Sequence, residues 1–163
     1  MLSAPESGSL VDDVAAYEQA CDGVLANTRH DLRIFAPDLD AALLNREQVM
    51  ECLVRFTRHN RNAKVRILVA DGDRVASQSH RLIHLSRRLS SFINIRVLPA
   101  ENRDESQCWL LADGKTLLWR PDYSQLRHGM VQRDPARSGA LSRQFDTLWE
   151  QSTSAAALRQ LHL

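Results

Sequence analysis

The chain has 163 residues, with 21 basic and 20 acidic side chains and a net charge of +1. This length suits one domain with a single core, and the balanced charge excludes a uniform field that would draw the whole protein to DNA or to an anionic membrane. Cys21, Cys52 and Cys108 are odd in number and widely spaced, so we expect neither a disulfide framework nor a zinc cluster. We find no signal peptide and no membrane-spanning run, and we expect a cytoplasmic protein.

We expect residues 1–9 to be a disordered leader and residues 10–163 to form one α/β domain. Apolar residues recur at helical intervals from Leu10 to Leu25, which predicts a first amphipathic helix. A short strand at residues 32–36 stops at Pro37, because proline cannot donate to a sheet ladder. Residues 37–45 should be a loop or a short turn, and residues 47–58 a second helix.

The other elements are organised around residues 64–98, which predict a strand, a helix and a second strand. Val65–Ala70 is an apolar, β-branched run that ends in a turn, residues 82–89 carry leucines at helical spacing, and residues 92–97 alternate as a strand. Two strands joined through a helix lie parallel, with a right-handed crossover. The sequence therefore predicts an α/β fold with a mixed, largely parallel central sheet and helices on both faces.

Beyond residue 100 the pattern changes to a hairpin. Two apolar runs, at residues 108–112 and 116–119, flank Asp113-Gly114, a dipeptide that supplies the positive φ angles of a tight turn. Met130 and Val131 should add another short strand.

Asp134 and Pro135 predict the start of a last helix, as an N-cap followed by a first-turn proline. We expect a short C-terminal turn with Leu158 and Leu161 to dock on the body. The three tryptophans, Trp109, Trp119 and Trp149, should lie in or near the core.

Two histidines on the expected central helix are the first candidate site. His80 and His84 are four residues apart on the polar side of that helix and should share one face, a spacing that can hold a metal ion. No glutamate completes an HExxH motif, no third ligand is indicated, and Arg81, Arg87 and Arg88 add positive charge to the same helix. Solvated or capping histidines are therefore the simpler interpretation, and we expect no metal and no cofactor.

Basic residues on two helices are the second candidate, an anion-binding surface, provided that both helices cover the same face of the sheet. Aromatic side chains that could stack on bases do not interleave with them, and a charge run is more often a solvated face. Nucleic acid is thus a weakly supported partner. The group comprises Arg55, Arg58, His59, Arg61, Arg81, Arg87 and Arg88.

Asp71 and Asp73 are the third candidate, because they follow a buried strand at the end where open α/β sheets bind ligands. They could bind a cation or act as an acid and base pair, although Asp-Gly-Asp is also an ordinary turn. Cys108 has no motif that marks a nucleophile, and we expect it to be a buried thiol.

The hairpin and the last helix resemble half of a phospholipase D-like domain. Members of that superfamily carry HxKxxxxD on a strand, often followed by Gly-Lys, and a late helix with Phe-x-x-Leu-Trp; this chain has Asp113-Gly114-Lys115 and Phe145–Trp149. Ser106 and Cys108 stand where the histidine and the lysine belong. In the family the histidine attacks phosphorus and the lysine neutralises phosphate oxygens, and serine and cysteine cannot reproduce these roles.

The chain is also similar to an uncharacterised bacterial family of degenerate phospholipase D-like domains related to the HKD superfamily. The similar stretches are residues 65–69, 80–90, 95–96 and 145–149. Members of that family resemble modules associated with GNAT-type acetyltransferases, which implies an accessory role.

We therefore predict a non-catalytic phospholipase D-like accessory or binding module that binds a phosphate-bearing ligand or a protein partner such as an acetyltransferase. The alternative is an enzyme with a rebuilt site, a hydrolase or phosphodiesterase with His80 or His84 as general base and Asp71 as its partner. A homodimer is a further alternative, because phospholipase D-like halves commonly pair across their active-site face. The candidate ligand-binding residues are His80, Arg81, His84, Arg87, Arg88 and Lys115.

Overall fold

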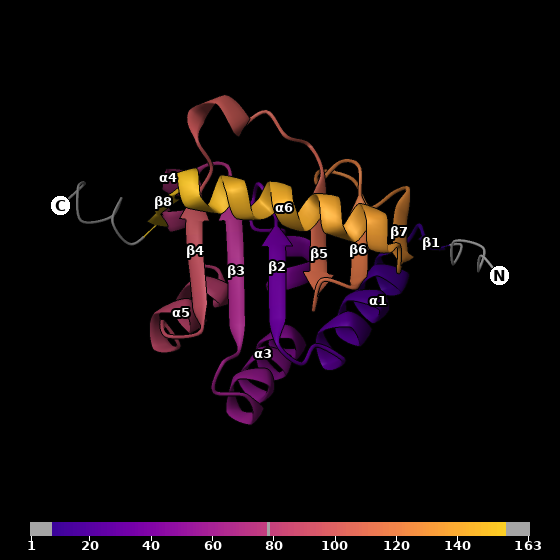
Figure 1. Cartoon of the computed structure of the whole chain (residues 1–163), viewed down its shortest axis with the longest axis horizontal. Helices are drawn as coiled ribbons and strands as arrows, with labels where there is room; N and C mark the ends of the chain where they lie inside the picture. Colours follow the sequence, from indigo (N-terminus) through magenta and orange to yellow (C-terminus); the bar gives the residue numbers. More distant parts are fainter. Residues whose placement is uncertain (1–7, 78, 156–163) are drawn as a thin grey trace.

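The computed structural model describes residues 8–77 and 79–155. These residues form an eight-stranded sheet with the strand order β1-β7-β6-β5-β2-β3-β4-β8 (Figure 1). The strands are β1 Ser9–Val11, β2 Asp31–Phe35, β3 Lys64–Val69, β4 Ile93–Val97, β5 Cys108–Ala112, β6 Thr116–Arg120, β7 Gly129–Gln132 and β8 Thr153–Ser154. The α-helices are α1 Val14–Ala26, α2 Ala41–Leu44, α3 Glu47–His59, α4 Gly72–Ser77, α5 Arg81–Arg88 and α6 Pro135–Gln151, and a 3-10 turn covers Ala100–Asn102.

The sheet is mixed, but it is not largely parallel. β2 pairs with β3, and β3 with β4, in the parallel sense, as the predicted crossover requires. The other five of the seven strand pairs among the described residues are antiparallel, so the prediction of a largely parallel sheet is wrong. The physical reason is the hairpin: β5 runs back beside β2, and β6 and β7 continue as an antiparallel meander.

Helices cover both faces of the sheet, which confirms that part of the prediction. Figure 1 shows α6 across one face and α1, α3 and α5 on the other. The core between the sheet and α6 is aromatic: Phe35 stacks on Trp109, Trp109 meets Phe145 edge-on, and Phe145 stacks on Trp149. Trp119 is partly buried beside this cluster, so all three tryptophans lie in or near the core as predicted.

The N-terminal part differs from the prediction. Ser9–Val11 pairs with β7 as an edge strand, and the helix begins at Val14 instead of Leu10. Asp13 sets this start, because its carboxylate accepts a hydrogen bond from the Ala16 N–H and caps the helix. Of the expected leader, only Gly8 and Ser9 belong to the described residues, and Ser9 is the first residue of β1.

Two short helices replace expected loops and turns. Ala41–Leu44 forms α2 within the expected loop, and Gly72–Ser77 forms α4, which begins inside the expected turn at Asp71-Gly72-Asp73. The Asp71 carboxylate accepts a hydrogen bond from the Arg74 N–H, so it holds the first turn of α4. Among the described helices, none has the length and apolar character needed to cross a membrane.

The hairpin and the last helix are confirmed. Asp113 and Gly114 have φ angles of 56° and 67°, the left-handed conformation that the β5–β6 turn requires. Asp134 caps α6 by accepting hydrogen bonds from two backbone N–H groups, with Pro135 in the first turn. β7 contains the expected strand at Met130 and Val131. The predicted C-terminal turn with Leu158 and Leu161 lies outside the described residues.

Candidate functional site

The positions to which the resemblance assigns the phospholipase D-like motif, Ser106, Cys108 and Asp113, lie at opposite ends of β5. Ser106 and Cys108 are at its start, where Cys108 pairs with Arg120 at the end of β6. Asp113 follows its other end, in the turn to β6, beside the start of β2. Because Lys115 is in that same turn, it is separated by the length of the strand from Ser106 and Cys108.

A buried ion pair lies beside Cys108. The Arg120 guanidinium donates to both oxygens of Asp40, with Nη1–Oδ2 and Nη2–Oδ1 distances of 2.8 and 2.7 Å, and these side chains are 3% and 6% exposed. Burial opposes the charge of Arg120, but the hydrogen bonds from Arg120 to Asp40 raise its pKa overall. The pair is therefore charged and closed from solvent.

Cys108 is the buried thiol that the sequence predicts. Its Sγ lies 3.6 Å from Oδ2 of Asp40, and burial, with Asp40 adding to it, raises the pKa of Cys108 well above the usual value. Cys108 thus stays a neutral thiol and is a poor nucleophile. Ser106 donates its hydroxyl hydrogen to the Pro121 carbonyl.

The ion pair is held by the residues around it. The Arg120 guanidinium also donates to the Tyr123 carbonyl and lies 5.5 Å from the centre of the Tyr17 ring. Burial raises the pKa of Tyr17 to about 12, so its phenol is neutral. The neighbourhood of Cys108 is therefore a packed polar cluster.

His80 does not lie on the polar side of the helix, and this part of the prediction is wrong. It precedes α5 as its N-cap and is only 1% exposed. Its Nδ1 accepts from the Leu82 N–H at 3.0 Å, and its Nε2 lies 3.1 Å from the Leu39 carbonyl oxygen. Burial lowers the pKa of His80, so the ring is neutral and donates from Nε2 to Leu39. The capping interpretation is correct for His80.

The other histidine, His84, and four of the six predicted arginines line a groove between α3 and α5. This helix groove has a volume of about 620 Å³ and is lined by Glu47, Met50, Glu51, Val54, Arg55, Arg58, His59, Arg81, His84, Leu85 and Arg88. The two basic helices therefore cover the same face of the sheet, as the predicted anion-binding surface requires. Arg61 and Arg87 are exposed but do not line the groove.

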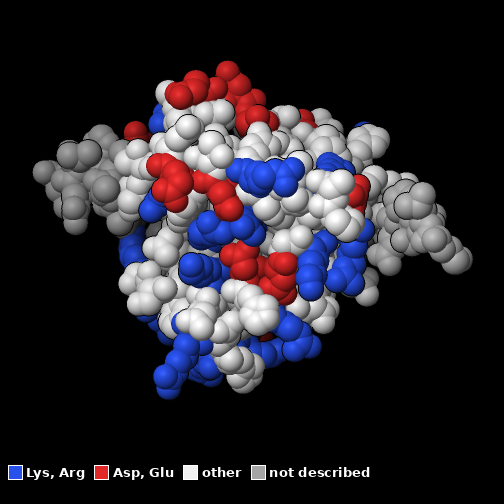
Figure 2. All heavy atoms as spheres, viewed as in Figure 1, with Lys and Arg blue, Asp and Glu red and all other residues white. Residues whose placement is uncertain are grey.

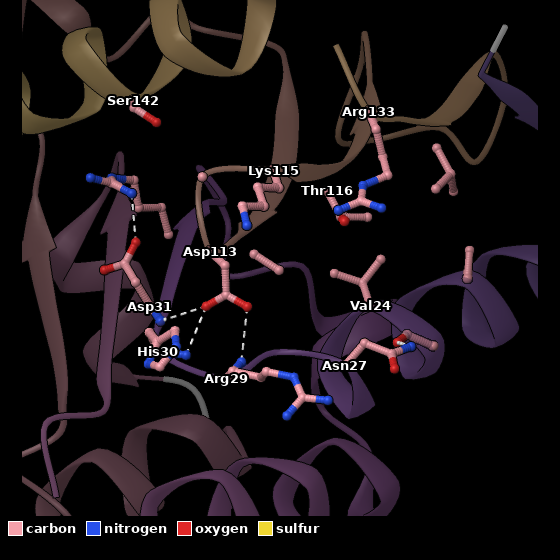
Figure 3. A pocket seen from close by; sticks show the side chains of 16 residues that line it. Val24, Asn27, Arg29, His30, Asp31, Asp113, Lys115, Thr116, Arg133 and Ser142 are labelled. Carbon is pink, nitrogen blue, oxygen red and sulfur yellow. Dashed lines mark hydrogen bonds and ion pairs between the residues drawn. The ribbon is translucent and has the colours of Figure 1, made fainter. Parts of the chain in front are cut away.

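A second hollow, of about 1080 Å³, surrounds the β5–β6 turn and the start of β2. We call it the basic hollow. On the face seen in Figure 2, basic side chains lie on both sides of an acidic centre and along the lower edge. Figure 3 shows Lys115 and Arg133 extending into the hollow, and Arg29 along its lower edge.

Both carboxylates in the basic hollow are already engaged. Asp113 accepts hydrogen bonds from the backbone N–H groups of Arg29, His30 and Asp31 at 2.9, 2.7 and 3.0 Å. Burial alone would raise the pKa of Asp113, but these donors outweigh it and lower the pKa. Asp31 pairs with Arg33 and Arg66. Asp113 thus joins the hairpin turn to the start of β2 and needs no further cation.

By contrast, three cations of the basic hollow have no carboxylate partner in the part of the chain that the structure describes. Among the described residues, the exposed side chains of Arg29, Lys115 and Arg133 form no ion pair. The hydroxyls of Thr116 and Ser142 line the same hollow. Sequence reasoning found Lys115 but missed Arg29 and Arg133, because they come from separate segments and belong to no motif.

Asp71 and Asp73 lie at the other end of the sheet, in a hollow of about 460 Å³ that also contains Asp38, Arg74 and Arg103. Burial raises the pKa of Asp38. Within the described residues, no three histidine, cysteine or carboxylate side chains are grouped so that they could hold a metal ion.

Solved structures with a similar fold include proteins of the phospholipase D family. TrmBL2, an archaeal chromatin protein with a novel mode of DNA binding, has a TM-score of 0.68 at 13% identity; the match covers 94% of this chain but 57% of that one. Nuc from Salmonella typhimurium, a phospholipase D family member, has a TM-score of 0.57 at 12% identity, with 82% and 87% covered. NucT from Helicobacter pylori has a TM-score of 0.60 at 12% identity, with 90% and 98% covered.

These structural matches establish a phospholipase D-like fold, and at identities this low they establish the fold alone. No curated protein matches the sequence. Residues 13–161 match the family described as "Domain of unknown function (DUF7931)", which spans most of the chain. The protein therefore belongs to this family and has a phospholipase D-like fold.

Proposed function

We propose that this protein is a non-catalytic phospholipase D-like domain that binds a phosphate-bearing ligand in the basic hollow. The observation that carries the proposal is a set of three cations, Arg29, Lys115 and Arg133, that form no ion pair within the described part of the chain and surround a hollow whose carboxylates are engaged. Guanidinium groups bind phosphate oxygens through paired N–H donors, and an ammonium adds a compact charge. The nearby hydroxyls supply further donors.

The packed cluster around Cys108 supports the absence of catalysis. A phosphodiesterase of this fold needs a nucleophile and a cation that face the substrate. Here the position expected for the cation is a neutral buried thiol, and the neighbouring guanidinium is bound to Asp40 inside the protein. Ser106 is exposed but has no general base that hydrogen-bonds to it among the described residues.

The alternative enzyme is less well supported by the geometry. Both ring nitrogens of His80 are engaged with backbone groups, and among the described residues the ring of His84 makes no hydrogen bond to a carboxylate. Neither histidine therefore has the oriented partner of a general base. The acetyltransferase partner and the homodimer stay predictions from the family resemblance.

Calorimetric titration with inorganic pyrophosphate tests the binding. We expect the wild-type protein to bind it and the variant Lys115→Gln/Arg133→Gln to lose at least tenfold in affinity, because two of the three free cations are removed. Arg127→Gln is the matched control: Arg127 is also exposed, but it follows β6 at the end away from the β5–β6 turn. No binding by the wild-type protein, or equal binding by all three proteins, would refute the proposal.

Hydrolysis of bis(p-nitrophenyl) phosphate tests the absence of catalysis. We expect no turnover above the buffer rate. Turnover by the wild-type protein that disappears in Ser106→Ala would show that the degenerate positions still carry chemistry. Turnover that disappears in His84→Gln would instead support the rebuilt enzyme.

A further inference from the structure

We propose that the basic hollow is one end of a longer basic track that binds double-stranded nucleic acid through its phosphate backbone. This inference rests on the proposed function, because it extends the same binding site. The other end of the track is the helix groove between α3 and α5. Between them lies a connecting hollow of about 590 Å³ at the ends of α1 and α3.

The three hollows are continuous because they share walls. Asn27, Arg29 and His30 line both the basic hollow and the connecting hollow. Arg55 and His59 line both the connecting hollow and the helix groove. The track therefore runs from the β5–β6 turn, past the ends of α1 and α3, to α5.

The track concentrates positive charge that the whole chain lacks. Its lining contains eight lysines or arginines and four aspartates or glutamates, a surplus of four positive charges. The net charge of the chain is +1, so the rest of the protein has a net charge of −3. The lower edge of the face in Figure 2, which is rich in basic side chains, belongs to the same end of the molecule as the ends of α1 and α3 in Figure 1.

Most of these cations are free to meet a ligand. Arg33 and Arg81 form ion pairs, the latter with Glu47 at 3.8 Å. Among the described residues, the other six form none: Arg29, Arg55, Arg58, Arg88, Lys115 and Arg133. Arg58 and Arg88 lie in the last turns of their helices, where the helix dipole favours cations. That effect does not explain Arg29, Lys115 and Arg133, which lie outside the helices.

The shape and lining of the track favour a duplex over other polyanions. A path of separated cations matches a row of phosphates better than it matches a single phosphate. In the described lining, Phe56 is the one phenylalanine, tyrosine or tryptophan, and it is buried, so the track lacks the exposed large aromatic rings on which unpaired bases most often stack. A planar bilayer would meet only the rim of a concave path. Contacts to the backbone alone carry no sequence information.

Fluorescence anisotropy with a labelled DNA duplex of about 20 base pairs tests this proposal between about 50 and 200 mM salt. The logarithm of the binding constant should fall linearly with the logarithm of the salt concentration, with a slope of about −5, because each phosphate contact contributes about −0.9 and six free cations line the track. Two duplexes of unrelated sequence should bind equally.

Variants at the two ends separate this proposal from the previous one. Arg58→Gln/Arg88→Gln should make the salt slope less steep by about 2 and leave the pyrophosphate affinity unchanged. Lys115→Gln/Arg133→Gln should weaken the binding of both ligands, and Arg127→Gln neither. Equal urea midpoints would verify that these exposed substitutions leave the fold intact.

If pyrophosphate binds but Arg58→Gln/Arg88→Gln leaves the slope unchanged, or the duplex does not bind at low salt, the ligand is a small phosphate. The track is then refuted, while the proposed function stands. If pyrophosphate does not bind, the proposed function fails. A duplex whose binding depends on the α3 and α5 arginines but not on Lys115 and Arg133 would place its site on the helices alone and would also refute the track.

Discussion

Arg120→Met should destabilise the protein strongly through the charge that it leaves behind. The substitution removes the guanidinium but keeps an apolar, unbranched stem of similar reach. The carboxylate of Asp40 then loses two hydrogen bonds, of 2.8 and 2.7 Å, and stays in a place where its side chain is only 6% exposed. Removal of one partner from a buried ion pair typically costs about 3–5 kcal/mol, and we expect a loss in this range.

The double variant Asp40→Asn/Arg120→Met isolates that charge effect. The substituted amide is neutral, and asparagine tolerates the left-handed conformation of this position, where φ is 46°. The remaining loss of stability comes from a buried amide whose hydrogen bonds are incompletely satisfied, and this costs about 1–3 kcal/mol. The double variant should therefore be more stable than Arg120→Met and far more stable than the sum of the two single losses predicts.

Urea unfolding at pH 7, followed by tryptophan fluorescence and circular dichroism, measures these differences. With a slope of about 2 kcal/mol per molar urea, the midpoint of Arg120→Met should fall by roughly 2 M. Arg127→Met, at an exposed arginine, should stay within about 0.5 kcal/mol of the wild type. A loss below about 1 kcal/mol for Arg120→Met, or strict additivity of the two substitutions, would contradict the reasoning.

Three further predictions test other parts of the fold. Cys108→Lys places a second cation beside a buried guanidinium and should lower the thermal midpoint by more than about 6 °C; a smaller change would show that the site is open to water. Asp113→Asn should cost about 1–2 kcal/mol at pH 7 in urea unfolding. The pKa of Asp113 is lower in the folded state than in the unfolded state, so the stability that its ionised carboxylate contributes is fully present above the unfolded pKa of about 3.9 and is lost as the pH falls through the folded pKa. The difference in unfolding free energy between Asp113→Asn and the wild type should therefore shrink towards pH 2. A difference that stays constant with pH would refute the ionic origin. Gly129→Ala should cost about 1–3 kcal/mol of stability, because the added methyl group overlaps the Tyr17 phenol. Gly23→Ala is the control and should be neutral or stabilising, because the space around Gly23 is open. Equal thermal midpoints of the two variants would contradict this prediction.

Much of the local structure could be predicted because its causes are local. The turn at Asp113-Gly114 follows from the need for positive φ angles, and the start of α6 follows from the capping carboxylate of Asp134 and the proline after it. The parallel unit from β3 to β4 follows from an apolar run, a helical face and a second run. Counting back from Asp113 likewise shows Ser106 and Cys108 at the positions where the phospholipase D-like motif has histidine and lysine.

The sheet as a whole was predicted less well, because the pairing of strands depends on segments that are far apart along the chain. The short edge strand at Ser9–Val11 exists only through its pairing with β7, and no periodicity marks three residues. The antiparallel placement of β5 beside β2 gives the sheet its mixed character. A pattern read along one segment does not say which partner that segment will meet.

The sequence by itself determined most of the helices and strands and showed that the HxK pattern of phospholipase D-like domains is missing, because both depend on the order of neighbouring residues. Only the tertiary structure decided that His80 caps a helix against the Leu39 carbonyl, that Asp40 and Arg120 form a closed ion pair, and that Arg29, Lys115 and Arg133 share a hollow. These contacts join residues from distant segments. Their burial and charge follow from the packing of the whole sheet and its helices, which no local pattern contains.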